Sequence, residues 1–266
     1  MSRGGAGDAR GHRVESAALS RLQVGARDLV GLTLSPAQLD QFEAYYRELV
    51  SWNERVNLTA IVDPVEVAVK HFLDSLSCLL AFPPGSCLGL PAGGSPERSW
   101  SLIDVGSGAG FPGLPLKMVC PNLSVTCVDS VRKKTAFVQH LVQWLGLQQV
   151  EVVTARAEDL AHAPEHRERY DLVVSRAVAD LRVLSEYCLP FATLGGLVIA
   201  PKGTGIEAEI SIAHHAIGIL GGHLREAMPI DLPGLEGQRQ LVLLDKMRPT
   251  PSAYPRRAGI PERRPL

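Results

Sequence analysis

The sequence has few cysteines, no long hydrophobic run and no excess of charge of either sign. Its five cysteines are odd in number, scattered and never spaced as Cys-x-x-Cys. This pattern predicts neither a disulfide framework nor a zinc site, and it favours a reducing compartment, the cytoplasm. No window approaches the roughly 18 consecutive apolar residues of a membrane span, and the N-terminus lacks the apolar segment of a secretory signal.

The charge balance also argues at first against a dedicated nucleic-acid-binding protein. Lys and Arg number 27 and Asp and Glu 28, which gives a net charge of −1, whereas such proteins usually carry a clear basic excess. The charge is unevenly distributed, however, because residues 246–266 hold six Lys or Arg residues and one Glu. We predict that residues 247–266 form an extended basic arm that follows RNA phosphates, separately from any cofactor site. A frayed, solubilising tail is the alternative.

The length of 266 residues and the 45% hydrophobic content predict one sizeable α/β domain with a small helical cap. Residues 1–30 are rich in Gly and Arg and are expected to be flexible. Helix-start signals at Ser35-Pro36 and Asp63-Pro64 place the helical cap at residues 31–82. In residues 83–99, 11 of 17 are Pro, Gly or Ser, which is typical of a linker.

From residue 100 to residue 246 the pattern changes to short apolar runs that alternate with helical stretches. This alternation predicts βαβ units and a mostly parallel sheet. Two further runs are joined by a connection too short for a crossover helix, so they predict a closing hairpin and one antiparallel strand. The expected strands are 101–105, 124–128, 150–154, 172–174 and 197–200, and the hairpin comprises 224–228 and 240–244.

A glycine-rich turn follows the first expected strand. Gly106, Gly108 and Gly110 are spaced as G-x-G-x-G, and Phe111 stands where a dinucleotide-binding turn requires Gly or Ala. Asp104 precedes the turn, where it can face an ammonium group, and Asp129 ends the next strand, where it can accept hydrogen bonds from ribose hydroxyls. Acids at both strand ends favour S-adenosylmethionine over a pyrophosphate. The alternative is that the glycines only form a turn and Asp129 only caps a helix.

The ends of the third and fourth strands carry the remaining candidates. In such a fold Glu158 lies beside the adenine, although by itself it is a solvated loop acid. The fourth strand ends at Arg176 without an obligatory base or nucleophile. That absence favours methylation of guanine nitrogen 7, which has a lone pair and no proton, so that alignment suffices. Arg176 and Lys202 can supply donors to phosphate or to guanine oxygen 6. The alternative for Arg176 is that it only forms a structural ion pair. The alternative for the whole protein is a non-catalytic binding module.

These motifs in this order resemble one family, the bacterial 16S ribosomal RNA (guanine-N7)-methyltransferases, RsmG or GidB. The resemblance extends from about residue 33 to the end of the chain. It rests on Trp52-Asn53, Asn57-Leu58-Thr59, His71, Asp74-Ser75, Asp104 through Leu116, Asp129-Ser130, Lys133-Lys134, Ser175-Arg176-Ala177, Lys202-Gly203, Arg239 and Tyr254 through Pro261.

The resemblance implies a class I S-adenosylmethionine-dependent methyltransferase that methylates nitrogen 7 of a guanine in the 530 loop of 16S rRNA, at position 527 of the usual rRNA numbering. By position, the implied cofactor contacts are Gly106, Phe111, Ala157, Glu158 and Arg176. Candidates for the RNA-facing mouth of the pocket and for phosphate contacts are Asn53, Asn57, His71, Arg132, Lys133, Lys134, Arg256, Arg257, Arg263 and Arg264.

We therefore expect S-adenosylmethionine as cofactor, and 16S rRNA or the small ribosomal subunit as partner. We expect no membrane, no metal and a monomer. Two other functions stay open at this point. One is a class I methyltransferase of another substrate, which would not need the basic tail. The other is a non-catalytic RNA- or nucleotide-binding protein with this fold.

Overall fold

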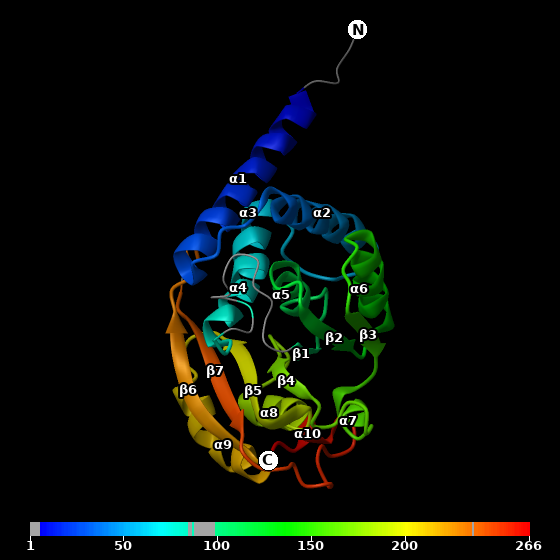
Figure 1. Ribbon diagram of the computed structural model, residues 1–266, viewed down its shortest axis with the longest axis vertical. Helices are drawn as coiled ribbons and strands as arrows, with labels where there is room; N and C mark the ends of the chain where they lie inside the picture. Colours follow the sequence, from blue (N-terminus) through cyan, green and yellow to red (C-terminus); the bar gives the residue numbers. More distant parts are fainter. Residues whose placement is uncertain (1–5, 85–86, 88–98, 236) are drawn as a thin grey trace.

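A single mixed sheet organises the molecule. The computed structural model describes residues 6–84, 87, 99–235 and 237–266, with side chains from residue 16 onward. Within them the sheet has seven strands in the order β3-β2-β1-β4-β5-β7-β6 (Figure 1). The strands are β1 (Trp100–Val105), β2 (Leu123–Asp129), β3 (Val150–Thr154), β4 (Tyr170–Val174), β5 (Ala192–Lys202), β6 (Gly222–Ile230) and β7 (Arg239–Lys246).

The strand directions match those expected from the sequence. The first five strands pair in parallel, and β7 pairs antiparallel with both β5 and β6. The closing hairpin is therefore confirmed, with β7 inserted between β5 and β6. This order is that of the class I methyltransferase fold, which confirms the predicted fold class.

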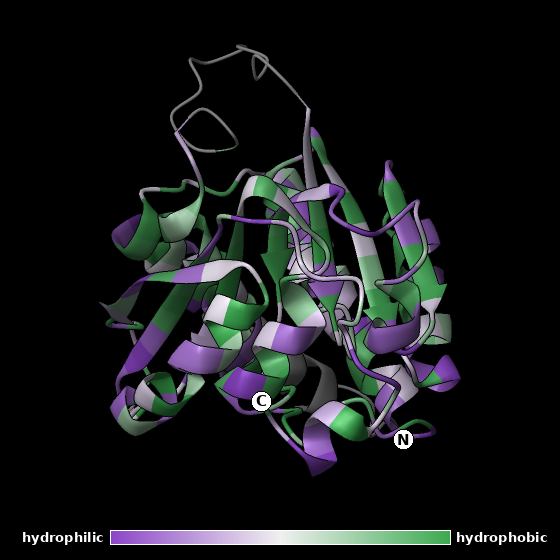
Figure 2. Cartoon of the chain, turned by 90° about the horizontal axis from the view of Figure 1, so that it is seen from below, coloured by the Kyte–Doolittle hydropathy of each residue, from purple (hydrophilic) through white to green (hydrophobic). Residues whose placement is uncertain are grey.

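Helices cover both faces of the sheet, which explains the nearly continuous apolar runs in its strands. Along β1, Leu102 packs into one hydrophobic core and Ile103 into the other, because successive side chains point to opposite faces. Figure 2 shows the strands as mostly hydrophobic and hydrophilic residues on the helices and loops outside them. One face carries α5 (Gly113–Val119), α6 (Arg132–Trp144) and the N-terminal helices; the other carries α7 (Ala157–Leu160), α8 (Leu181–Cys188) and α9 (Glu207–Ile219).

The N-terminal segment is helical, which corrects the expectation of a flexible start. Helix α1 spans Ala6–Val30, and Ala18, Leu22 and Ala26 on one of its faces are buried. Gly25 permits the close approach, since a Cβ there would lie 2.6 Å from Leu73 Cδ2. The glycine-rich composition hid this helix, although its apolar residues recur at the helical spacing of four.

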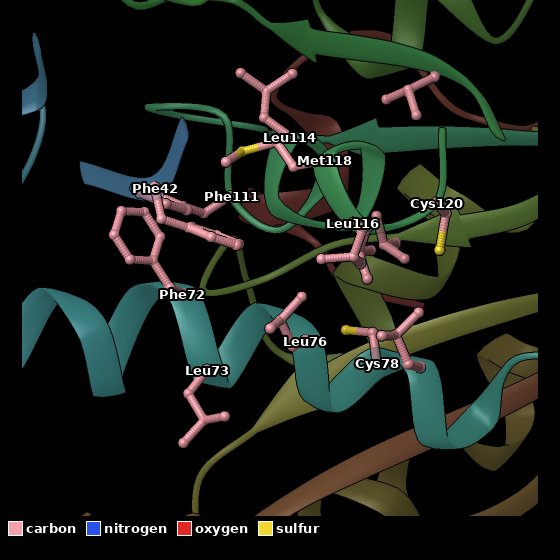
Figure 3. Packing of buried hydrophobic residues seen from close by; sticks show 14 of the residues in the cluster. Phe42, Phe72, Leu73, Leu76, Cys78, Phe111, Leu114, Leu116, Met118 and Cys120 are labelled. Carbon is pink, nitrogen blue, oxygen red and sulfur yellow. The ribbon is translucent and has the colours of Figure 1, made fainter. Parts of the chain in front are cut away.

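The predicted helical cap belongs to the main hydrophobic core. Ser35 is the N-cap of helix α2 (Pro36–Asn53), and its side chain forms a capping box with Gln38. The following helical stretch comprises α3 (Pro64–Val67), the π-helical η1 (Ala68–Leu73), α4 (Asp74–Leu76) and the 3₁₀-helical η2 (Ser77–Ala81). Phe42 of α2 and Phe72 of η1 pack with Phe111 and the apolar side chains of α5 (Figure 3).

The cysteine pattern misled in one respect. Cys87 and Cys120 form a disulfide, with their Cα atoms 5.4 Å apart. The predicted linker at residues 83–99 brings Cys87 back to the end of α5, a return that a separation of 33 residues does not reveal. Most of that linker, residues 85–86 and 88–98, lies outside the described residues. Cys78, Cys127 and Cys188 are free and buried.

Candidate functional site

A cavity of about 420 Å³ opens at the carboxyl ends of β1, β2 and β4. Its volume falls within the range of roughly 300–1,000 Å³ that is usual for small-molecule sites. It lies where the strand order reverses beside β1, the usual position for ligands in such sheets. The residues around it include Thr59, His71, Gly106, Ser107, Gly108, Phe111, Asp129, Lys134, Ala157, Glu158, Arg176, Tyr187 and Glu262.

The glycine-rich turn forms the floor of the cavity. Gly106, Gly108 and Gly110 all have positive φ angles, which other residues rarely adopt. A Cβ at Gly106 would lie 2.5 Å from Val178 Cγ2, whereas a Cβ at Gly108 would have only the Gly106 carbonyl oxygen within reach, at 4.0 Å. Gly106 therefore permits tight packing, and Gly108 leaves open space for a ligand. Gly110 packs against Tyr45 and Leu114 and does not line the cavity.

Asp129 lies at the end of β2 with its carboxylate held by the backbone. Its Oδ2 accepts from Gly108 N at 3.0 Å and its Oδ1 accepts from Val131 N at 2.8 Å. Lys134 Nζ lies 4.0 Å from Oδ2. Each carboxylate oxygen can accept more than one hydrogen bond, so the Asp129 carboxylate keeps capacity for hydroxyl groups of a ligand in the cavity.

Asp104 does not reach the cavity, which corrects the expectation that it faces a ligand's ammonium group. Its side chain is fully buried, and Oδ2 accepts from Gly113 N at 2.7 Å. The carboxylate thus ties the end of β1 to the start of α5, on either side of the glycine-rich turn. Burial raises the pKa of this carboxyl to about 7, although the Gly113 hydrogen bond and the Arg176 charge act in the opposite direction. Oδ1 has no hydrogen-bond partner among the described residues.

The free energy of unfolding of the Asp104→Asn variant should depend less on pH than that of the parent. A carboxyl whose pKa rises on folding, here from 3.8 to about 7, contributes stability that is lost as pH increases through that interval. We therefore expect the parent to lose stability relative to the variant by about 1 kcal/mol per pH unit between pH 5 and 7. Urea denaturation of both proteins at several pH values measures this difference; parallel pH profiles would contradict it.

Phe111, Arg176 and His71 form the end of the cavity that faces the N-terminal helices. The Phe111 ring stacks on Tyr45, with centroids 5.1 Å apart, and on His71 at 4.7 Å. The Arg176 guanidinium lies 5.3 Å from the Phe111 centroid. Asp74 holds that guanidinium, because its Oδ2 accepts from Arg176 Nη1 at 2.7 Å. Arg176 is therefore both ion-paired and part of the cavity wall.

His71 is a neutral group at this end. Burial, followed by the nearby Arg176 charge, lowers its pKa to about 4. Its Nε2 shares a hydrogen bond of 2.8 Å with Thr59 Oγ1. Asn53 lies outside the cavity wall and shapes the same loop, since its Oδ1 accepts from Leu58 N and Thr59 N. Asn57 is exposed in that loop.

The opposite end of the cavity combines residues distant in sequence. Glu158 is buried, and its Oε1 accepts from Gly259 N at 2.9 Å. Tyr187 of α8 and Glu262 of α10 (Ile260–Arg263) complete this wall. Burial raises the pKa of the Tyr187 phenol, and the Glu158 and Glu262 carboxylates raise it further. Sequence reasoning missed Tyr187 and Glu262, because no local motif marks either.

The predicted cations fall into two groups. Lys202 is engaged elsewhere, since its Nζ donates to Ala179 O at 2.6 Å and to Glu209 Oε1 at 2.7 Å, and it does not line the cavity. Arg256 is also engaged, by Glu186. The others lie at the start of α6 or near the C-terminus: Lys134 lines the cavity, and Arg132, Lys133, Arg257, Arg263 and Arg264 are exposed.

The C-terminal segment does not extend as an arm, so that expectation is wrong. Arg256 Nη2 donates to Glu186 Oε2 at 2.6 Å, and its backbone N–H donates to Glu186 Oε1 at 2.8 Å. Glu186 is fully buried. The basic residues beyond β7 are therefore presented from a segment bound to the body of the protein.

Neither a metal centre nor a membrane span is found in the part of the chain that the structure describes. No group of three or more His, Cys, Asp or Glu side chains there is arranged to hold a metal ion. Among the same residues, no helix is both long and apolar enough to span a membrane.

Comparison with known proteins gives a consistent set of matches. Residues 38–229 match the family model of rRNA small subunit methyltransferase G, GidB. The chain is 51% identical over 236 residues to ribosomal RNA small subunit methyltransferase G of Roseiflexus castenholzii, covering 89% of this chain and 95% of that protein. The corresponding protein of Pelotomaculum thermopropionicum is 47% identical over 245 residues, 92% of this chain and 97% of that protein.

Solved structures are similar at a greater distance. A 16S rRNA (adenine(1408)-N(1))-methyltransferase mutant from Catenulisporales acidiphilia matches with a TM-score of 0.47 and 15% identity, over 57% of this chain and 87% of that chain.

The family match over residues 38–229 includes every residue that lines the cavity except Glu262.

Proposed function

The chain belongs to the rRNA small subunit methyltransferase G family, and from that membership we propose that it methylates nitrogen 7 of a guanine in the 530 loop of 16S rRNA. S-adenosylmethionine is the methyl donor. The residues present fit this cofactor: Gly108 leaves open space beside the cavity, and Asp129 offers acceptors for ribose hydroxyls. The chain is an enzyme, and the target atom is the part of the proposal that experiment must test.

The reaction that the residues at the Phe111 end of the cavity can support favours nitrogen 7 as the target atom. The lone pair of this nitrogen forms the new bond to the methyl carbon while the bond from that carbon to the sulfonium sulfur breaks, and the positive charge passes to the guanine. No proton has to leave, so no base is needed. An exocyclic amine, in contrast, must lose a proton. The carboxylates nearest this end are engaged, Asp74 by Arg176 and Asp104 by Gly113.

Arg176 is suited to orient the target base. Its Nη1 is occupied by Asp74 and by the carbonyl of Lys70, which fixes the plane of the guanidinium. Nη2 lies 3.4 Å from His71 Nδ1, and the remaining N–H groups of Arg176 are available to donate to guanine oxygen 6, an acceptor that arginine commonly recognises. The Phe111 and neutral His71 rings, stacked on each other beside Arg176, give this end of the cavity an uncharged aromatic wall next to the space for the base.

The experiment combines the purified protein, S-adenosylmethionine with a labelled methyl group, and small ribosomal subunits from cells that lack this modification. We expect label in 16S rRNA at nitrogen 7 of one guanine in the 530 loop, mapped by cleavage at 7-methylguanine. Already modified subunits serve as the control and should accept no label. Label at another atom, or in protein, would refute the proposal. Cofactor binding without any transfer would favour a non-catalytic binding protein.

Arg132 and Lys133, exposed beside the cavity, are proposed to contact RNA phosphates. Replacing both by Ala should weaken RNA binding and reduce the slope of log K against log salt by about 1 for each phosphate that is no longer neutralised. Cofactor affinity should not change. Arg225→Ala is the matched control, because Arg225 is paired with Asp245 on β6 and β7. The proposed RNA contact is wrong if the double variant keeps the salt slope of the parent.

Two further expectations depend on this substrate. A ribosomal RNA substrate supports the proposal that the protein acts in the cytoplasm. The cysteine pattern no longer supports that location, since Cys87 and Cys120 are joined. The chain is expected to act as a monomer on the small ribosomal subunit. Size-exclusion chromatography with light scattering measures the molar mass of the free protein and therefore its oligomeric state.

A further inference from the structure

The segment after β7, Thr250–Leu266, is bound along the side of the molecule that carries α7 and α8; we call it the C-terminal strap. Arg167 Nη2 donates to Thr250 O at 2.7 Å, and Arg167 Nη1 donates to Tyr254 O at 2.9 Å. His162 Nε2 donates to Pro255 O at 2.8 Å. Together with the Glu186–Arg256 pair, these contacts fix the path of the strap over its first half.

The start of the strap is anchored by a buried cation. Lys246, the last residue of β7, is 1% exposed, and its Nζ donates to Leu189 O at 2.7 Å and lies 2.9 Å from Glu168 Oε1. Glu168 Oε1 in turn accepts from Thr250 N at 2.7 Å. The direction in which the strap leaves the sheet is therefore set by Lys246 and Glu168, and it leads toward the cavity.

The end of the strap forms part of the cavity wall. Gly259, with a φ of 78°, immediately precedes α10, and its N–H donates to the buried Glu158 carboxylate. This bond places Glu262 on the wall of the cavity with Ala157 and Tyr187. Figure 1 shows α10 next to α7 and α8. The strap thus brings a carboxylate from the last turn of the chain to the cofactor site.

The two carboxylates at this end have different environments. Glu158 is 3% exposed, and one of its oxygens is occupied by the Gly259 N–H. Glu262 is exposed toward the cavity and makes no hydrogen bond or ion pair with any residue that the structure describes. Both carboxylates lie near the Tyr187 phenol, whose pKa they raise. An ionised carboxylate only accepts hydrogen bonds, so Glu262 selects a ligand group that donates.

The adenine of the cofactor offers such a group. With the ribose held at Asp129, the base would be held by the part of the cavity that Ala157 and Glu262 line, where its exocyclic amine would be the hydrogen-bond donor. We propose that Glu262 accepts a hydrogen bond from this amine, and that Glu158 is a positioning residue that holds Glu262 in place through Gly259. The inference rests on the proposed function only in taking S-adenosylmethionine as the ligand.

The test measures binding, by calorimetry, of S-adenosylhomocysteine and of S-inosylhomocysteine, in which an oxo group replaces the amine. We expect the parent to prefer the adenosyl ligand by about tenfold or more, the effect of one hydrogen bond to a charged group. Glu262→Ala should lose most of this preference by weakening the adenosyl ligand alone. Glu207→Ala, which removes an exposed carboxylate from the first turn of α9, is the matched control and should keep the preference.

Glu158 is tested with a second pair of variants. Glu158→Ala should reduce the preference in the parent but not further in Glu262→Ala, because it acts through Glu262. Glu158→Gln keeps an acceptor for Gly259 N and should retain the preference. The inference is overturned if Glu262→Ala keeps the preference or weakens the binding of both ligands equally. It is also overturned if Glu158→Ala abolishes a preference that Glu262→Ala keeps, or if the parent binds neither ligand. Only the last would also refute the cofactor assignment.

Discussion

Replacing Glu186 by Ala is expected to lower the free energy of unfolding by about 3–5 kcal/mol, the usual cost of removing one partner from a buried ion pair. Glu186 is fully buried on α8 and accepts from the backbone N–H and from Nε and Nη2 of Arg256. The substitution leaves these donors without their acceptor. It also releases the C-terminal strap from α8 at its midpoint.

Thermal or urea unfolding, followed by circular dichroism, measures this loss. Asp245→Asn is the control, because Asp245 pairs with Arg225 at a more exposed position and such pairs contribute only about 0–1 kcal/mol. Equal destabilisation by the two substitutions would contradict the assignment of Glu186 as the anchor of the strap. If the strap also places Glu262 at the cofactor, Glu186→Ala should weaken the binding of S-adenosylhomocysteine under conditions where the variant is still folded.

The central sheet could be predicted from the sequence because each of its strands is marked by residues within the strand and directly next to it. Each strand is a short apolar run that is followed by a polar or glycine residue. The intervals between the runs are long enough for the crossover helices that parallel strands require. Asp129 could be placed for the same reason, since the end of β2 and the glycine-rich turn after β1 meet at one edge of the sheet. Gly108 N and Asp129 Oδ2 are indeed in contact.

The parts that could not be predicted depend on contacts between distant segments. Glu158 and Gly259 are 101 residues apart, and Glu186 and Arg256 are 70 apart, so no spacing links them. The net positive charge after β7 predicts an arm in solvent, whereas the buried Glu186 carboxylate, together with Arg167 and His162, binds that segment to the body of the protein. Asp104 was misassigned because its position before the turn does not show that its side chain is directed at Gly113.

Asp129→Ala is expected to weaken the binding of S-adenosylhomocysteine by about 100-fold, or about 3 kcal/mol. Two effects add. The ribose hydroxyls lose a charged acceptor, and Gly108 N and Val131 N lose the carboxylate that holds the glycine-rich turn against the end of β2. Calorimetric titration of the folded variant measures the change in affinity.

Asp180, a second carboxylate that accepts from nearby backbone N–H groups, separates the ligand contact of Asp129 from the loss of such backbone hydrogen bonds. Asp180 caps α8 by accepting from Arg182 N and Val183 N, and it does not line the cavity. Asp180→Ala should therefore cost about 1 kcal/mol of stability, as cap removal usually does, without a change in cofactor affinity. An affinity loss at Asp129 no greater than that at Asp180 would remove Asp129 from the cofactor site. In contrast, loss of discrimination against a 2′-deoxyribose analogue only in Asp129→Ala would identify its carboxylate as the ribose acceptor.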